Sequence, residues 1–231
     1  IPYSYEAPAS YVDVNLKGSL NIFEAGRRSG VERIVHTSTS EVYGTAQFTP
    51  ITEEHPIQGQ SPYSATKIAA DHMAEAYARS FDLPVVILRP FNTYGPRQSE
   101  RAVIPTIIRQ AIDPDCASIQ LGDTTTYRYF SYVQDTVNAF TTAGSSKSLE
   151  FGVAYNAGAE AVISIGDLAD KLVELTGCNK PISSSADRVR PSQSEVRLLH
   201  ASSEKFRAAS GWESHSSLND GLQSTIEWWR G

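Results

Sequence analysis

The strongest constraint on the fold comes from two short apolar segments that flank a helix. Residues Arg33–Thr39 are rich in β-branched side chains, as expected of a strand buried in a parallel sheet. Ser61 offers a helix N-cap and Pro62 suits the first helical position, so a helix is predicted to run to about Phe81. A second buried strand, Val85–Arg89, follows. This strand–helix–strand order predicts an α/β fold with a parallel sheet.

Similar patterns place the remaining elements. Residues 9–29 are expected to form a helix that stops at Gly30, and Ser164 with Asp167 forms a capping box for a helix to about Thr176. Serine-rich residues 183–185 and 214–217 are predicted to be loops. The other predicted helices are Ala102–Ile112, Gln134–Ala143, Ser203–Ala209 and Leu218–Trp229, and the other predicted strands are Tyr127–Val133, Val153–Asn156 and Arg197–His200.

Length and composition limit the class of protein. A chain of 231 residues can bury the core of one large domain, and 40% hydrophobic with 20% charged residues is typical of a soluble globule. A net charge of −6 argues against a nucleic-acid partner, because phosphate binding needs a basic surface. No apolar run approaches the ~20 residues of a membrane helix. Cys116 and Cys178 are far apart, which favours reduced thiols in the cytoplasm over a disulfide framework.

Two motifs carry groups suited to proton and hydride chemistry. Tyr63 and Lys67 are four residues apart on a predicted helix, so both side chains lie on one face. A nearby ammonium lowers the pKa of a tyrosine, which would make Tyr63 a base at neutral pH. Thr39, Ser40 and Glu41 follow the first strand, and open α/β sheets bind ligands outside the carboxyl ends of their strands. Taken singly, each motif has another explanation. Tyr and Lys occur at this spacing on many helices by chance, and hydroxyl and carboxylate residues after a strand often cap the next turn.

Together with further motifs, these residues resemble the extended short-chain dehydrogenase/reductase superfamily, specifically its sugar-nucleotide 4,6-dehydratases. The likeness extends from end to end. A run at residues 44–56, Gly-Thr-Ala-Gln-Phe-Thr-Pro-Ile-Thr-Glu-Glu-His-Pro, is most similar to the dehydratases of bacterial legionaminic-acid-type pathways. The other matching runs are Thr-Ser-Thr-Ser-Glu-Val-Tyr-Gly (37–44), Ser-Pro-Tyr-Ser-Ala-Thr-Lys (61–67), Arg-Pro-Phe-Asn-Thr-Tyr-Gly-Pro-Arg (89–97), Tyr-Arg-Tyr-Phe-Ser-Tyr-Val-Gln-Asp (127–135), Arg-Val-Arg-Pro-Ser (188–192), Gly-Trp (211–212) and Gly-Leu-Gln-Ser-Thr-Ile-Glu-Trp (221–228).

The resemblance implies a Rossmann-like doubly wound parallel sheet with a smaller α+β substrate domain. Residues 1–91 and 133–157 would form the remaining part of the NAD-binding domain, and residues 92–132 and 158–231 the nucleotide-sugar domain. Family members begin with a strand and a Gly-x-x-Gly-x-x-Gly turn, a fingerprint that none of the 15 glycines here forms. At ~30 residues per βαβ unit, we expect roughly 70–90 residues of N-terminal strands to be missing from this fragment.

The implied reaction needs NAD and has three steps. Tyr63, assisted by Lys67 and Thr39, would take the proton of the sugar 4-hydroxyl while C4 gives its hydride to NAD. Ser38 would also lie against the cofactor. Glu41 would then remove the proton at C5, the C6 hydroxyl would leave as water, and the hydride would return to C6.

The identity of residue 40 separates subclasses of the family. Glucose-type dehydratases have an aspartate at this position, which supplies the proton for the leaving water, and Ser40 is too weak an acid to replace it. The guanosine-diphosphate-mannose type also has serine, so Glu41 is expected to relay its captured proton. This points away from deoxythymidine-diphosphate-glucose as the substrate. Glu41 argues against 4-epimerases, which need no carboxylate at C5, but uronate decarboxylases share the Ser-Thr-Ser-Glu stretch.

Five residues are implied in substrate binding. Arginine suits a diphosphate because its planar fork pairs with phosphate oxygens. By family position, Arg128 and Arg190 are the first candidates and Arg97 is the third. Asn92 would meet the sugar or its phosphates, and Ser4 the hexose.

Three functions stay open at this point. The first is a sugar-nucleotide 4,6-dehydratase, the second a nucleotide-sugar 4-epimerase or uronate decarboxylase, and the third a truncated, non-catalytic module that binds sugar nucleotides. Product identity separates the first two, and a glycine fingerprint in the upstream reading frame would argue against the third. The five histidines lack metal-ligand spacing, so no metal is predicted. The resemblance implies a homodimer through the helices near 9–29 and 62–81.

Overall fold

A three-stranded parallel sheet forms the centre of the fold. The computed structural model describes residues 1–159, 162–184 and 202–231. The strand order is β1–β2–β7, with β1 at Ile34–Thr37, β2 at Val85–Pro90 and β7 at Ala154–Ala157. All pairing in this sheet is parallel. The predicted α/β fold with a parallel sheet is confirmed.

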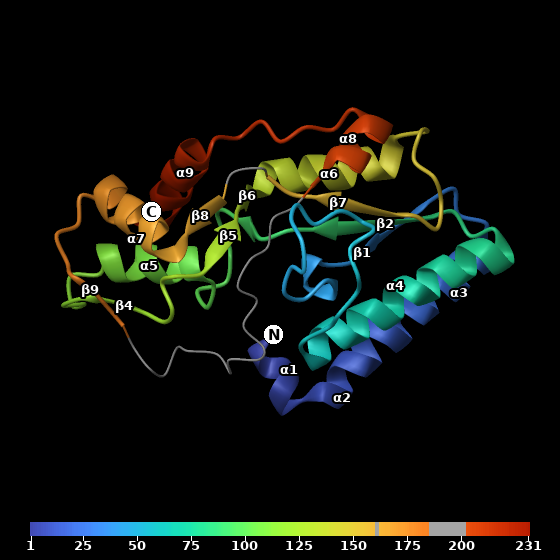
Figure 1. Cartoon of the computed structure of the whole chain (residues 1–231), viewed down its shortest axis with the longest axis horizontal. Coiled ribbons are helices and arrows are strands. Elements are labelled where there is room, and N and C mark those ends of the chain that lie inside the picture. The colour runs from blue at the N-terminus through green and yellow to red at the C-terminus, as the bar shows by residue number, and fades with distance from the viewer. Residues whose placement is uncertain (160–161, 185–201) are drawn as a thin grey trace.

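Helices cover both faces of this sheet, as in a doubly wound fold. Helices α3 (Gly18–Ser29) and α4 (Pro62–Phe81) run along one face, and α6 (Val133–Ser145) and α8 (Glu204–Ser210) lie on the other (Figure 1). Successive residues of β2 divide between the two layers, because side chains alternate along a strand. Val85 and Ile87 pack on the side of α3 and α4, whereas Val86 and Leu88 join the core beneath α6 and α8.

Local sequence sets the ends of the helices beside the site. The Ser61 hydroxyl accepts from the Ser64 amide at 3.1 Å and the Ser64 hydroxyl accepts from the Ser61 amide at 3.0 Å, which closes a capping box at the start of α4. The predicted helix over residues 9–29 is present and stops at Gly30, whose φ is +62°. It begins as α2 (Pro8–Tyr11), passes through a π-helical turn (Val12–Lys17) and continues as α3; a short α1 (Pro2–Glu6) precedes it.

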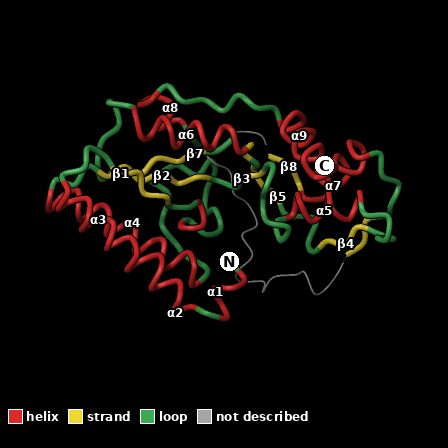
Figure 2. The backbone as a smooth tube through the Cα atoms, turned by 180° about the vertical axis from the view of Figure 1, so that it is seen from behind, coloured by secondary structure: helices red, strands yellow, loops and turns green. Residues whose placement is uncertain are grey.

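A second lobe lies beside the sheet and has its own apolar core (Figures 1 and 2). Its helices are α5 (Val103–Ile112), α7 (Ile165–Thr176) and α9 (Leu218–Arg230). Ile104, Ile107, Leu168, Leu172 and Leu222 are among its fully buried residues. Three two-stranded pairs complete this side of the molecule: β3 (Thr93–Tyr94) with β6 (Ser131–Tyr132), β4 (Ile119–Leu121) with β9 (Ile182–Ser184), and β5 (Tyr127–Tyr129) with β8 (Val162–Ser164).

The structure corrects two of the predicted elements. The strand expected over Tyr127–Val133 is divided, because β5 pairs antiparallel with β8 whereas β6 pairs parallel with β3, and Val133 begins α6. Ser183 and Ser184 were expected in a loop, but they belong to β9, where they pair with β4. The strand predicted at Arg197–His200 lies outside the described residues.

Candidate active site

The predicted catalytic groups meet at the carboxyl end of β1. Thr39 is the N-cap of a short 3₁₀ turn, Ser40–Val42, and its hydroxyl accepts from the Glu41 amide at 3.3 Å. Tyr63 in the first turn of α4 shares a side-chain hydrogen bond with Thr39, and the charge of Glu41 is close enough to act on the Tyr63 phenol. Ser40 is buried at 2% exposure. The structure therefore brings Thr39, Glu41 and Tyr63 together.

Lys67 lies one turn after Tyr63 on α4. Its ammonium donates a hydrogen bond to the carbonyl oxygen of Thr37, the last residue of β1. Burial lowers the pKa of Lys67, and the negative charge of Asp71, one further turn along α4, opposes that effect. An ammonium has three N–H donors, and the bond to Thr37 occupies one of them.

The expected lowering of the Tyr63 pKa is wrong for this arrangement. Burial raises the pKa of Tyr63, the hydrogen bond with Thr39 lowers it, and Glu41 and Asp71 add to the rise. Lys67 is directed at the strand carbonyl, so its charge does not offset the burial of the phenol. The phenol is therefore protonated at neutral pH in this structure, and Thr39 is the contact that favours the phenolate.

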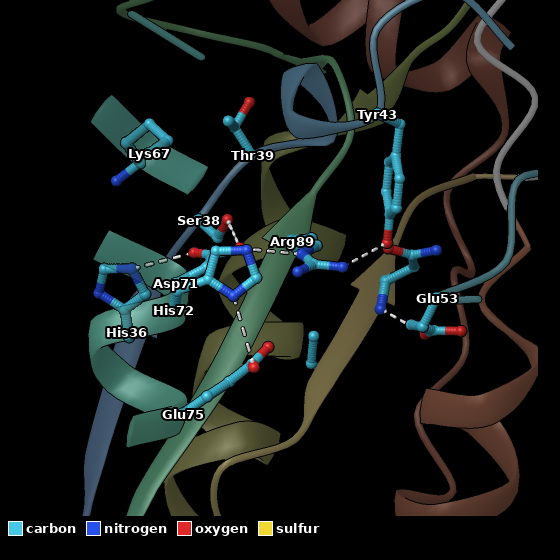
Figure 3. A network of polar contacts seen from close by, with 12 residues as sticks. His36, Ser38, Thr39, Tyr43, Glu53, Lys67, Asp71, His72, Glu75 and Arg89 are labelled. Atoms are coloured by element: carbon cyan, nitrogen blue, oxygen red, sulfur yellow. Dashed lines mark hydrogen bonds and ion pairs between the residues drawn. The ribbon is translucent and has the colours of Figure 1, made fainter. Parts of the chain in front are cut away.

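A buried polar network lies directly beneath these groups (Figure 3). Asp71 has no exposed surface, and its carboxylate accepts from the Ser38 hydroxyl at 2.7 Å and from Arg89 Nε at 3.0 Å. Its other oxygen lies 3.2 Å from His36 Nε2. Burial alone raises the pKa of Asp71, but His36, Arg89 and Ser38 outweigh it and leave the pKa below its usual value.

The network continues from Arg89 to β7. Arg89 is only 2% exposed, and its Nη1 donates to the Tyr43 hydroxyl at 2.8 Å. Burial raises the pKa of Tyr43 to about 12 despite the neighbouring guanidinium, so the phenol keeps its proton and donates to Asn156 Oδ1 at 2.8 Å. The backbone N–H of Asn156 donates to Glu53 Oε1 at 2.6 Å. These contacts tie α4, both neighbouring strands and β7 into one unit behind the catalytic groups.

A cavity of about 1010 Å³ extends between the N-terminal helix and the second lobe. Asn92, which follows β2, and Arg128, on β5, both line it, whereas none of the predicted catalytic residues does. The lining also includes Arg101 and Arg109 as cations and Glu6, Glu100 and Asp123 as anions. This volume is at the upper end of the range of small-molecule sites.

Three polar atoms of the cavity lining are buried without a hydrogen-bond partner within the described residues. They are Asn92 Nδ2, Gln98 Oε1 and Arg109 Nε. Leaving a polar atom buried and unpaired costs about 1–3 kcal/mol. The lining thus offers two donors and an acceptor to a polar ligand.

The remaining predicted residues are placed as follows. Ser4 is fully buried in α1 and its hydroxyl donates to the Ile1 carbonyl at 2.7 Å. The Ser38 hydroxyl is directed at Asp71. Arg97 is exposed, has a φ of +65° and does not line the cavity. Arg190 lies outside the described residues. Ser4, Ser38 and Arg97 thus do not line the cavity.

Sequence reasoning missed four residues of the site region. Asp71 continues the Tyr63–Lys67 face by one more turn, and Arg89 is a charge within an apolar strand; both were available signals. Arg109 is the one charged side chain of α5. Gln98 in the preceding loop carried no signal of its own.

Within the parts of the chain that the structure describes, no helix is long and apolar enough to cross a membrane. The same residues contain no group of three or more histidines, cysteines or carboxylates placed to hold a metal ion.

Comparison with known proteins identifies the family. The model of the GDP-mannose 4,6-dehydratase family matches residues 1–225. The chain belongs to this family. It is 30% identical to the low-salt glycan biosynthesis protein Agl12 of Haloferax volcanii, over 96% of this chain and 69% of that protein. It is also 30% identical to dTDP-D-glucose 4,6-dehydratase of Mus musculus, over 100% of this chain and 64% of that enzyme.

A solved structure and a further relative agree with this placement. The dTDP-glucose 4,6-dehydratase of Bacillus anthracis, solved in complex with NAD, superposes with a TM-score of 0.86 at 27% identity, over 95% of this chain and 68% of that one. A UDP-glucose 4-epimerase of Mycolicibacterium smegmatis is 29% identical over 98% of this chain and 72% of its own length. The chain thus spans about two thirds of the length of its relatives and belongs to the NAD-dependent short-chain dehydrogenase type of sugar-nucleotide enzyme.

The residues present fit the reactive end of NAD. A phenol and an ammonium stand one turn apart at the carboxyl edge of a parallel sheet, where such folds bind dinucleotides. Lys67 has donors beyond the one used by Thr37, and these suit ribose hydroxyls.

Proposed function

We propose that this chain provides the catalytic and substrate-binding residues of an NAD-dependent sugar-nucleotide 4,6-dehydratase. The reaction converts a nucleotide-diphosphate hexose into its 4-keto-6-deoxy form. The observation that carries the proposal is the Glu41 carboxylate held beside the Thr39–Tyr63 pair at the end of β1. Oxidation at C4 alone needs only the tyrosine and lysine, whereas elimination across C5 and C6 also needs a carboxylate.

Tyr63, Lys67 and Thr39 serve the first step. Tyr63, Lys67 and Ser38 would hold NAD, which would supply the acceptor for the C4 hydride and later the hydride donor to C6. Tyr63, whose burial raises its pKa, must first lose its own proton before it can accept that of the 4-hydroxyl, and the hydrogen bond with Thr39 favours the phenolate that this transfer requires. Lys67 would orient the ribose of the cofactor with the N–H donors that Thr37 leaves unused.

Glu41 serves the elimination. A C4 ketone makes the C5 hydrogen acidic, so a carboxylate can remove it. The electrons of the C5–H bond form the C5=C6 double bond, and the C6–O bond breaks. Glu41 then delivers its captured proton to the departing hydroxyl, which leaves as water, because the buried Ser40 is too weak an acid for this role. Hydride addition at C6, protonation of C5 by a proton from water and release of the Tyr63 proton to water complete a redox-neutral cycle.

The cavity supports a nucleotide-sugar substrate. Asn92 and Arg128 line it, and the unpaired atoms of Asn92, Gln98 and Arg109 can bind ribose, phosphate or base. We retain Arg190 and Arg97 as further diphosphate contacts and Ser4 as a hexose contact in this proposal.

Three broader features belong to the same proposal. The separate apolar cores of the sheet and of the second lobe support a division into an NAD-binding domain (1–91, 133–157) and a substrate domain (92–132, 158–231), but Phe206 and Trp212 of the last range pack in the core of the sheet. Exposed apolar residues on the outer helices, Val14 at 71% and Ile22 at 59%, support a homodimer through helices 9–29 and 62–81. The protein would act in the cytoplasm.

Product identity tests the function. The full-length protein is incubated with NAD and a panel of uridine, guanosine and deoxythymidine diphosphate hexoses and hexuronates, and the masses of the products are measured. A product lighter by one water molecule is expected. Loss of carbon dioxide from a uronate would make it a decarboxylase, and an unchanged mass with inverted C4 would make it an epimerase. Binding without conversion would make it a non-catalytic module.

A further inference from the structure

One buried charge has no part in the mechanism above. Asp71 has no exposed surface, yet it carries a carboxylate into the interface between α4 and the sheet. It lies one helical turn from Lys67, on the same face of α4 as Tyr63. In Figure 3 it stands between Arg89 and His36, with Ser38, Thr39 and Lys67 around it. Asp71 therefore contacts the segments of the chain that carry the catalytic groups, but it does not line the substrate cavity.

Its partners come from both neighbouring strands. Ser38 at the end of β1 donates at 2.7 Å, Arg89 of β2 donates at 3.0 Å, and His36 of β1 lies at 3.2 Å. Ser38 directly precedes Thr39, so the bond to Asp71 fixes the backbone that places the Thr39 hydroxyl against Tyr63. The ring of Phe23 packs edge-on against His36 on the other side, at 5.6 Å between centroids.

Stability alone does not account for this pair. The rest of the interface is apolar: Ala70, Ala74, Val85 and Ile87 are all completely buried. Replacing a buried ion pair by apolar residues of similar volume is often neutral or stabilising, because the desolvation of two charges offsets their attraction. The packing of this interface therefore does not explain a carboxylate at position 71, and we look for its role in its contacts with the catalytic region.

Its charge acts on both members of the catalytic pair. The charged and titratable groups around Lys67 and Tyr63 are Asp71 on α4, Glu41 on the 3₁₀ turn and Tyr11 on α2. Asp71 raises the pKa of Lys67, which burial lowers, and it also raises the pKa of Tyr63. Arg89 and His36 in turn lower the pKa of the Asp71 carboxyl.

We propose that Asp71 is a positioning residue of the reaction: through Ser38 it fixes the strand end that carries Thr39, and from one turn along α4 its charge favours the ammonium form of Lys67. The proposal rests on the proposed function of Tyr63 and Lys67. Its two parts separate by substitution, because Asp71→Asn removes the charge and keeps the size, Asp71→Glu keeps the charge, and Ser38→Ala removes only the hydroxyl.

The first test measures Lys67 directly and needs no turnover. With lysine labelled at Cε by ¹³C, the six lysines give few signals, and Lys67→Arg identifies that of Lys67. In Asp71→Asn we expect its titration midpoint to move to lower pH. Asp71→Glu and Ser38→Ala should keep the wild-type midpoint. Glu75→Gln is the matched control, because Glu75 is a carboxylate of the same helix that faces Arg79 and His72 instead.

The second test is the pH profile of turnover. Loss of the Asp71 charge favours both the phenolate and the neutral amine, so both limbs of the Asp71→Asn profile should move to lower pH. Ser38→Ala should lower kcat with the limbs unmoved. If Asp71→Asn does not fold, the double variant Asp71→Leu/Arg89→Met, which has no unpaired buried charge, undergoes the same titration and should show the same lower midpoint.

An unchanged Lys67 midpoint in the charge-removing variants would overturn the electrostatic part of the proposal. A midpoint that moves as far in Asp71→Glu as in Asp71→Asn would show a packing effect and would overturn it equally. An Ser38→Ala enzyme with wild-type kcat would overturn the positioning part. If the protein proves inactive on every nucleotide sugar, the lysine titration still decides the role of the charge, so the two failures are distinguishable.

Discussion

The buried pair of Arg89 and Asp71 makes a quantitative prediction about stability. Arg89→Met keeps the length of the side chain but removes the guanidinium. The buried Asp71 carboxylate then loses the hydrogen bond from Arg89 Nε at 3.0 Å and the positive charge that accompanies it. Breaking a buried ion pair by removing one partner costs about 3–5 kcal/mol. We therefore expect Arg89→Met to lose that much free energy of unfolding at pH 7, a large part of the ~5–15 kcal/mol typical of a domain.

Equilibrium urea unfolding at constant protein concentration measures the loss. The matched control is the double variant Arg89→Met/Asp71→Leu, which removes both charges and should unfold within about 1 kcal/mol of wild type or be more stable. The coupling between the two sites then follows from the double-mutant cycle.

The loss should also depend on pH in a defined direction. The pKa of Asp71 is lowered in the folded protein, so its contribution is present above the ordinary aspartate pKa of about 3.9 and disappears as the pH falls through the folded value. Without Arg89 the carboxyl takes up a proton more easily, and the difference between variant and wild type should shrink on acidification. A loss below about 1 kcal/mol at pH 7, or a loss that grows at acid pH, would refute this reasoning.

Three further predictions concern the site and its surroundings. Tyr63→Phe should lower turnover by about 10²–10⁴-fold while the urea midpoint stays near that of wild type, and a fully active variant would exclude Tyr63 as the base. Asn92→Ala should raise the Kd of the nucleotide sugar, measured by calorimetry, because Asn92 Nδ2 is an unpaired donor in the cavity lining; unchanged binding would place the ligand elsewhere. Gly44→Ala should lower the thermal midpoint more than Gly30→Ala. Both glycines have a φ near +60°, which costs roughly 1–2 kcal/mol for other residues, but only at Gly44 would the new Cβ come within 2.3 Å of the Gln58 carbonyl.

The parallel sheet and its covering helices were predictable because their signals are local. The apolar run of β2 and the Ser61–Pro62 start of α4 each lie within a few consecutive residues, and both elements form where expected. The β4–β9 pair was not predictable in the same way. Its strands have three residues each, Ile119 pairs with Ile182 across more than sixty intervening positions, and β9 contains two serines.

The same distinction between local and long-range signals applies to the candidate site. Tyr63 and Lys67 share a helix face by spacing alone, and Thr39 and Glu41 follow a strand, so their convergence could be expected. The direction of the Tyr63 pKa shift could not, because it depends on burial and on where the Lys67 ammonium is directed. The unpaired atoms of Gln98 and Arg109 could not be predicted either, because their burial depends on how distant segments of the chain pack around the cavity.

The path of one hydrogen atom tests the central claim most directly. A nucleotide hexose that carries deuterium at C4 is converted by the protein with NAD in ordinary water, and the product is examined by NMR. A 4,6-dehydratase moves that deuterium to C6 of the 4-keto-6-deoxy product, and Glu41→Gln should oxidise C4 without forming that product. Deuterium that returns to C4, or product formed at the wild-type rate by Glu41→Gln, would contradict the account.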